Sequence, residues 1–96
     1  MKEFDLTIVS RGKTVHRGPA VYLGITTPEG TAGLEADHQP FLALLAGNSE
    51  ILWQPARGGQ SSPEGGNSLR AASGLVNFRD NRCTVTVTLP PEPAES

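Results

Sequence analysis

Apolar and polar residues alternate with a period of two at both ends of the chain. In the segment Phe4–Val9, the apolar residues Phe4, Leu6 and Ile8 are separated by polar residues. In the segment Arg82–Leu89, cysteine, valine and leucine side chains alternate with threonines. Because successive side chains of a strand point to opposite faces of a sheet, both segments are predicted to be strands with one buried face.

The same criterion predicts further short strands separated by turns. The predicted strands are Thr14–Arg17, Val21–Thr26, Gly33–Ala36, Asn48–Gln54, Leu69–Ser73 and Leu75–Phe78. The predicted turns are Ser10–Lys13, Pro28–Gly30 and Asp80–Asn81, the last being suited to positive φ. A strand that returns along Thr14–Arg17 is expected to stop at Gly18–Pro19. Gly24 indicates a bulge or a close backbone approach within its strand.

The most apolar run of the chain, Phe41–Leu45, has no alternation. Its composition would suit a helix, but Pro40 before it and Gly47 after it leave room for barely two turns. We therefore predict a strand that is buried on both faces.

About eight to ten short strands without a long helix predict an all-β fold, a small antiparallel β-sandwich or flattened barrel over residues 1–89. Residues 55–68 are rich in glycine, serine and proline and are predicted to form a mobile surface loop. The proline-rich residues 90–96 are expected to be an extended, disordered tail.

Charge and chemistry exclude several classes of function. The formal net charge is −2 and no basic run is present, which argues against a nucleic-acid partner. His16 has no second histidine or cysteine at metal-ligand spacing, so we expect a solvated strand residue and neither metal nor cofactor. Cys83, the single cysteine, is expected to be a buried apolar side chain. No apolar stretch approaches the roughly 20 residues of a membrane-spanning helix.

Three segments resemble one known family. Gly30–Gly47 reads GTAGLEADHQPFLALLAG, which is similar to the signature G-E-L-G-V-L-P-G-H-A-P-L-L-T-x-L-x-x-G of the F-type ATP synthase epsilon subunit. Leu6–Ser10 with Val15–Gly18, and Ala72–Val87, resemble two further segments of that family in the same order. Asp37, Gln39 and Leu75 depart from the residues usual there, namely glycine, alanine and glycine.

The resemblance implies a structural subunit of the F1 central stalk, which bridges the gamma subunit and the membrane c-ring in ATP synthesis or hydrolysis coupled to proton or sodium flow. It implies no catalysis and no small-molecule substrate. Its expected place is the cytoplasmic face of the cell membrane, as a peripheral part of F1. Carried over by position, the gamma contacts are Ser10, Arg11, Asp37, His38 and Gln39, and the c-ring contacts are Glu29, Gly30 and Thr31. The family's C-terminal helical hairpin has no counterpart in the sequence, so coupling without its braking role is expected.

Two other functions fit the residues. A stand-alone β-sandwich adaptor that binds another protein is the principal alternative. A minimal hydrolase could use Asp37 and His38 as an acid–base pair, but no nucleophile in a G-x-S-x-G elbow accompanies them.

Overall fold

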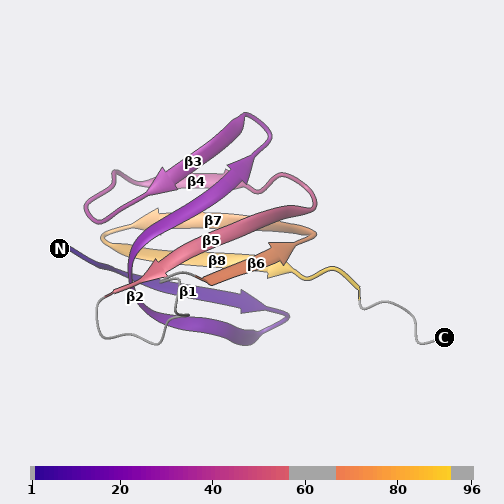
Figure 1. The fold of residues 1–96 in the computed structure, drawn as a ribbon, viewed down its shortest axis with the longest axis horizontal. Helices are drawn as coiled ribbons and strands as arrows, with labels where there is room; N and C mark the ends of the chain where they lie inside the picture. Colours follow the sequence, from indigo (N-terminus) through magenta and orange to yellow (C-terminus); the bar gives the residue numbers. More distant parts are fainter. Residues whose placement is uncertain (1, 57–66, 92–96) are drawn as a thin grey trace.

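A computed structural model describes residues 2–56 and 67–91 of the chain. These residues form eight strands (Figure 1). They are β1 (Phe4–Ser10), β2 (Lys13–Thr27), β3 (Gly30–Leu34), β4 (Phe41–Leu44), β5 (Ser49–Pro55), β6 (Asn67–Ala71), β7 (Ser73–Arg79) and β8 (Arg82–Thr88). The predicted all-β class is therefore confirmed. No membrane-spanning helix occurs among these described residues.

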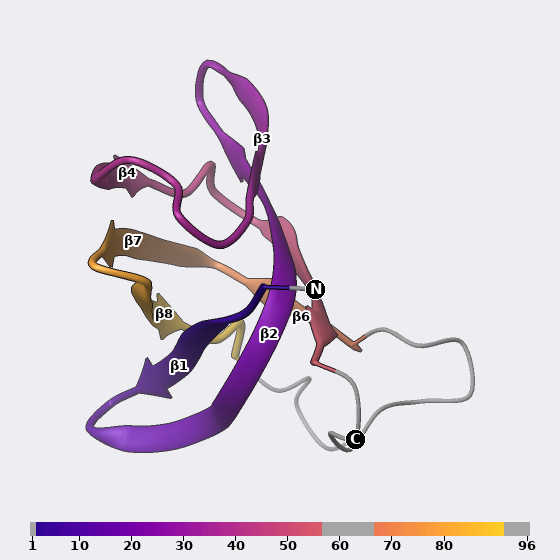
Figure 2. The same ribbon diagram turned by 90° about the vertical axis from the view of Figure 1, so that its left-hand side faces the viewer.

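The strands form one curled sheet in the order β4-β7-β8-β1-β2-β5-β6, with β3 paired to β2. The N-terminal half of β2 pairs with β1, and its C-terminal half pairs with β5 and β3. A register shift after Ala20 marks the place where β2 changes partner. The sheet therefore folds over on itself, with β7, β8 and β1 in one layer and β2 and β6 opposite them (Figure 2).

Two expectations about this sheet were wrong. The predicted strands Thr14–Arg17 and Val21–Thr26 are one strand, β2, and Gly18–Pro19 lie inside it. Pro19 is tolerated because it stands next to the point where the β1 ladder ends and the β5 ladder begins. The sheet is also not wholly antiparallel, since β1 and β8 are parallel. These two strands are separated by nearly the whole chain, so no tight hairpin forces them to be antiparallel.

The predicted turns at both ends of the sheet are confirmed. Arg11 and Gly12 have φ of 53° and 77°, and Asp80 and Asn81 have φ of 53° and 58°. Positive φ at both central residues is the geometry of a two-residue hairpin turn whose twist matches that of the strands. Each turn therefore closes its hairpin tightly, between β1 and β2 and between β7 and β8.

The core lies between the two layers and is filled mainly by aliphatic side chains. Phe4 and Phe78 face each other within it, with ring centroids 5.2 Å apart. The other large side chains with under 2% exposure are Leu6, Ile8, Leu23, Leu34, Ile51, Val76, Val85 and Cys83. The alternation predicted in β1 and β8 is thus confirmed at their inward positions.

Strand β4 differs from the prediction. Phe41–Leu45 was expected to be a strand buried on both faces, but the strand ends at Leu44, and Leu42 and Leu44 are 67% and 66% exposed. The reason is that only one face of β4 packs on the core, where Phe41 lies, while Leu42 and Leu44 point to the outer face of the sheet. An edge strand with one covered face leaves every second side chain in solvent.

The close approach predicted at Gly24 involves a side chain. A Cβ atom at Gly24 would lie 3.1 Å from the ring of Tyr22, and one at Gly33 would lie 2.8 Å from its hydroxyl. The Tyr22 ring therefore covers two glycines on neighbouring strands. Residues 57–66 of the predicted loop and 92–96 of the predicted tail lie outside the described residues, while Pro55, Asn67 and Ser68 belong to strands.

Candidate functional site

Asp37 lies in a cluster that joins three parts of the chain. Its carboxylate accepts a hydrogen bond from Lys2 Nζ at 2.7 Å and another from Asn81 Nδ2 at 3.0 Å. Its backbone N–H donates to Asn81 Oδ1 at 2.6 Å. Asp37 has a φ of 67°, a conformation that aspartate tolerates better than most residues. The N-terminal segment, the β3–β4 loop and the β7–β8 turn therefore meet at this side chain.

His38 follows Asp37 but does not pair with it. Its Nδ1 donates to the carbonyl oxygen of Gln39 at 2.8 Å. Its ring meets the rings of Phe41 and Phe78 edge-on, with centroids 5.8 Å away in both cases. The two side chains thus make separate hydrogen bonds, and the acid–base pair of the hydrolase hypothesis is not formed.

Ser10 and Arg11 lie far from Asp37–Gln39. Asp5 donates its N–H to Asn81, so the Asp37 cluster is at the beginning of β1, whereas Ser10 is at its end. Five residues of strand separate these ends by about 17 Å. Ser10 is 8% exposed, and Arg11 is the exposed residue of the pair. A single partner that contacts both predicted gamma-binding groups must extend along β1.

Glu29, Gly30 and Thr31, the predicted c-ring contacts, lie at the tip of the β2–β3 hairpin (Figure 1). Thr27 Oγ1 holds the tip, because it donates to the Gly30 carbonyl oxygen at 3.0 Å and accepts from the Glu29 N–H at 3.2 Å. All three residues are exposed. This tip and the Asp37 cluster lie at opposite ends of β3.

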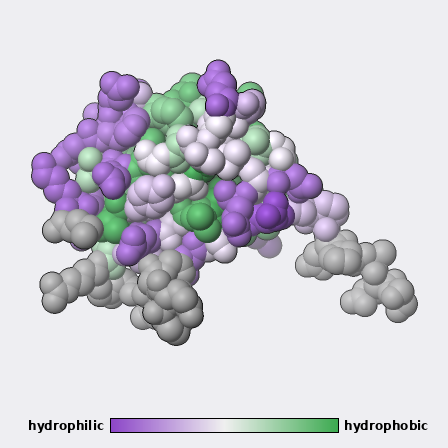
Figure 3. All heavy atoms as spheres, turned by 45° about the horizontal axis from the view of Figure 1, so that its top comes forward, coloured by the Kyte–Doolittle hydropathy of each residue, from purple (hydrophilic) through white to green (hydrophobic). Residues whose placement is uncertain are grey.

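An exposed apolar surface lies between the two predicted gamma-binding groups, and no pattern in the sequence indicated it. We call it the outer leucine face: Leu42 and Leu44 on β4 and Leu75 on β7, which is 40% exposed. The register places Leu44 beside Leu75, Leu75 beside Thr86, and Thr86 beside Val9. This row of side chains runs from the strand that follows His38 to the residue before Ser10. Hydrophobic side chains also reach the surface between hydrophilic ones in Figure 3.

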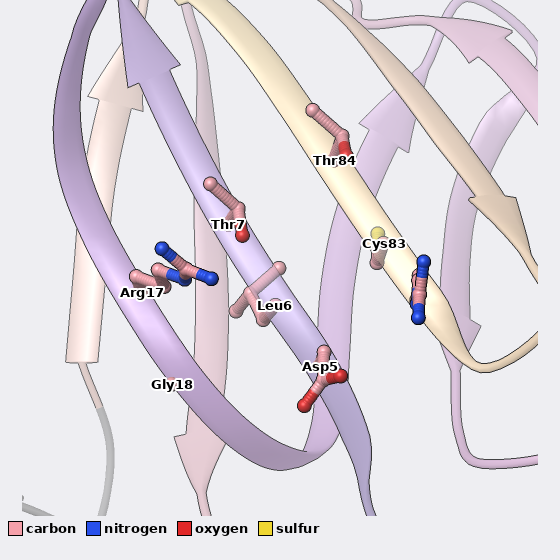
Figure 4. Close-up of a pocket in the computed structure, with 8 residues that line it drawn as sticks. Asp5, Leu6, Thr7, Arg17, Gly18, Cys83 and Thr84 are labelled. Atoms are coloured by element: carbon pink, nitrogen blue, oxygen red, sulfur yellow. The ribbon is translucent and has the colours of Figure 1, made fainter.

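A shallow polar pocket of about 390 Å³ lies over β1 and is lined by residues of β1, β2 and β8. Figure 4 shows Arg17, Thr7 and Thr84 on the strands that line it. The register sets these three side chains in one cross-strand row. Among residues 2–56 and 67–91, no group of three histidine, cysteine or acidic side chains is arranged to hold a metal ion.

Acid should open the Asp37 cluster. The hydrogen bonds from Lys2 and Asn81, together with the Lys2 charge, lower the pKa of Asp37 below its ordinary value of 3.8. A depressed carboxyl pKa contributes stability above the unfolded value and loses it as pH falls through the folded one. We expect the Asn81 side-chain amide NMR signals to titrate with a midpoint below pH 3.8. Asp37→Asn should abolish this titration, and a midpoint at or above the ordinary value would contradict the cluster.

The two remaining candidate residues are His16, which is half-buried, and Cys83, which is buried in the core. His16, expected in solvent, is half-buried, with its ring 4.9 Å from that of Trp53. Burial lowers its pKa, and its Nε2 has no hydrogen-bond partner among the described residues. Cys83 is buried, as expected, with 1% exposure.

Cys83 should be inert in the folded protein. Burial raises the pKa of its thiol to about 12, so the thiolate that attacks thiol reagents is scarce at neutral pH. We expect an aromatic disulfide reagent to react slowly with the native chain and rapidly after unfolding in guanidinium. Equal rates in the two states would contradict this burial.

No protein-family model matches the chain, and no curated protein matches it. Solved structures do match. A chain in the cryo-EM structure of the Euglena gracilis mitochondrial ATP synthase (OSCP, F1 and c-ring) aligns with a TM-score of 0.74 at 18% identity, over 88% of this chain and 50% of that one. A chain of the Tetrahymena thermophila mitochondrial ATP synthase central stalk and c-ring aligns with a TM-score of 0.66 at 16% identity, over 91% and 64%.

The chain therefore shares the fold of chains in two mitochondrial ATP synthase structures. The fold expected from the three similar segments is therefore confirmed. The alignment spans half of the Euglena chain and 64% of the Tetrahymena chain. At sequence identities of 16–18%, these structures support the fold alone. The roles of individual residues are argued from the geometry described above.

Proposed function

We propose that the chain is a non-catalytic rotor subunit of an F-type ATP synthase, which docks on the gamma subunit and on the c-ring at the cytoplasmic face of the membrane. The observation that carries the proposal is the epsilon-like fold together with the three ordered segments that resemble the epsilon family. A two-layered sheet with a close-packed core is stiff, which suits a part that transmits torque. Neither cofactor nor small-molecule substrate is required for this role.

The gamma subunit would lie along the outer leucine face. This surface supplies apolar area between His38–Gln39 at one end and Arg11 at the other, about 17 Å away along β1. Exposed leucines with polar residues at the rim are typical of protein interfaces. The c-ring would meet Glu29, Gly30 and Thr31 at the β2–β3 tip, which projects away from the Asp37 cluster.

Binding to gamma tests the proposal directly. The purified chain would be titrated with the gamma subunit encoded beside it, and we expect a dissociation constant in the micromolar range or tighter. Absence of binding at micromolar concentrations would contradict the proposal, and capture of a protein unrelated to ATP synthase would favour the adaptor alternative. His38→Ala should weaken gamma binding, whereas an effect confined to hydrolytic activity would favour the hydrolase hypothesis.

A further inference from the structure

The β3–β4 loop carries Asp37, His38 and Gln39, and its own hydrogen bonds hold it weakly. Among the described residues, two hydrogen bonds join residues of the loop: His38 N–H to the Glu35 carbonyl oxygen at 3.2 Å, and His38 Nδ1 to the Gln39 carbonyl oxygen at 2.8 Å. The left-handed φ of Asp37 adds strain that the surroundings must offset. Neither bond fixes Asp37, so the conformation of the residue that precedes His38 and Gln39 depends on contacts from outside the loop.

Asn81 supplies that support from another part of the chain. Its side chain both accepts from and donates to Asp37, which is 44 residues away in sequence. The β7–β8 turn itself does not need these bonds. Asp80 occupies the same turn with a φ of 53°, and its carboxylate lies 3.8 Å from Arg79 Nε, without a bond to Asp37.

We propose that Asn81 is a positioning residue for partner binding: through its two hydrogen bonds to Asp37 it holds His38 and Gln39 in the conformation that docks. This inference rests on the proposed function, since it takes the loop and the adjoining outer leucine face as the gamma-binding surface. It also explains why aspartate can stand where the epsilon family usually has glycine. The carboxylate of Asp37 gains bonds from Asn81 and Lys2 that a glycine could not accept.

The decisive comparison is Asn81→Gly against Asp80→Gly. Both replace a left-handed residue of one turn by glycine, and only the first removes the bonds to Asp37. For Asn81→Gly we expect hydrogen exchange of the Asp37 amide to accelerate about fivefold or more. We expect the dissociation constant for gamma to rise about five- to tenfold, because the loop must then be ordered on binding. Asp80→Gly should change neither, and both variants should have similar melting temperatures.

A double variant that restores the hydrogen bonds between residues 37 and 81 distinguishes a positioning role of Asn81 from a general effect on stability. Exchanging the two residues, Asp37→Asn with Asn81→Asp, lets the new carboxylate accept from the residue 37 amide and side chain, so gamma affinity should return toward the wild-type value. Faster exchange with unchanged affinity, or equal effects of the two glycine variants, would overturn the inference and leave the proposed function standing. A wild-type chain that does not bind gamma would overturn both.

Discussion

Replacing Gly74 by alanine is expected to lower the free energy of unfolding by about 2 kcal/mol, the middle of the range for overpacked cores. A Cβ atom at this position in β7 would lie 2.7 Å from Leu45 Cδ1 and 2.8 Å from the backbone carbonyl oxygen of Thr86. The leucine can move, but Thr86 is held in the β7–β8 ladder, so relief requires the strands to separate. For a domain of this size the melting temperature should fall by about 10 °C, measured by thermal unfolding.

Gly18→Ala is the matched control for that experiment. Gly18 also lies within a strand, and the nearest atom to a Cβ there is His16 Nε2 at 3.9 Å, an ordinary contact. Its effect should stay within about 0.5 kcal/mol, or be slightly stabilising because alanine restricts the unfolded chain. Equal losses in the two variants would mean that the backbone at Gly74 relaxes freely, against the close approach described above.

Local patterns predicted local features of this fold well. The alternation in Phe4–Val9 and Arg82–Thr88 correctly assigned inward and outward side chains, and Asp80–Asn81 correctly marked a turn with positive φ. Leu89, predicted to point inward, is 39% exposed just after β8 ends. Such features depend on a residue and its immediate neighbours. The parallel pairing of β1 with β8 and the continuity of β2 through Pro19 depend on which distant strand lies alongside, which no local pattern contains.

The candidate site shows the same division. Similarity to the epsilon family singled out His38 and its neighbours, but it could not show that Asn81 holds Asp37 from the β7–β8 turn. The run Phe41–Leu45 was taken as buried because its composition is that of a core strand. Composition alone does not distinguish an apolar side chain that packs inside the domain from one kept apolar at the surface for a partner. That distinction required knowing which face of β4 is covered by the core.

Polar substitution of the outer leucine face is expected to have the largest effect on function. Leu42→Ser combined with Leu44→Ser should raise the dissociation constant for gamma about 10- to 100-fold, since fully burying a leucine side chain contributes about 1.5–3 kcal/mol relative to leaving it exposed. Both side chains are about two-thirds exposed in the free chain, 67% and 66%, so the stability of the domain should change by less than about 0.5 kcal/mol.

Leu52→Ser supplies the control for this loss of binding. Leu52 is also a strand leucine with a half-exposed side chain, at 49%, but it lies on β5, which pairs with the C-terminal half of β2 and not with β4 or β7. Titration calorimetry of all three proteins with gamma should show weakened binding in the β4 variant alone. If Leu52→Ser weakened gamma binding and the β4 variant did not, the gamma subunit would dock on the opposite layer. The surface between His38 and Arg11 would then have to be explained by a different partner.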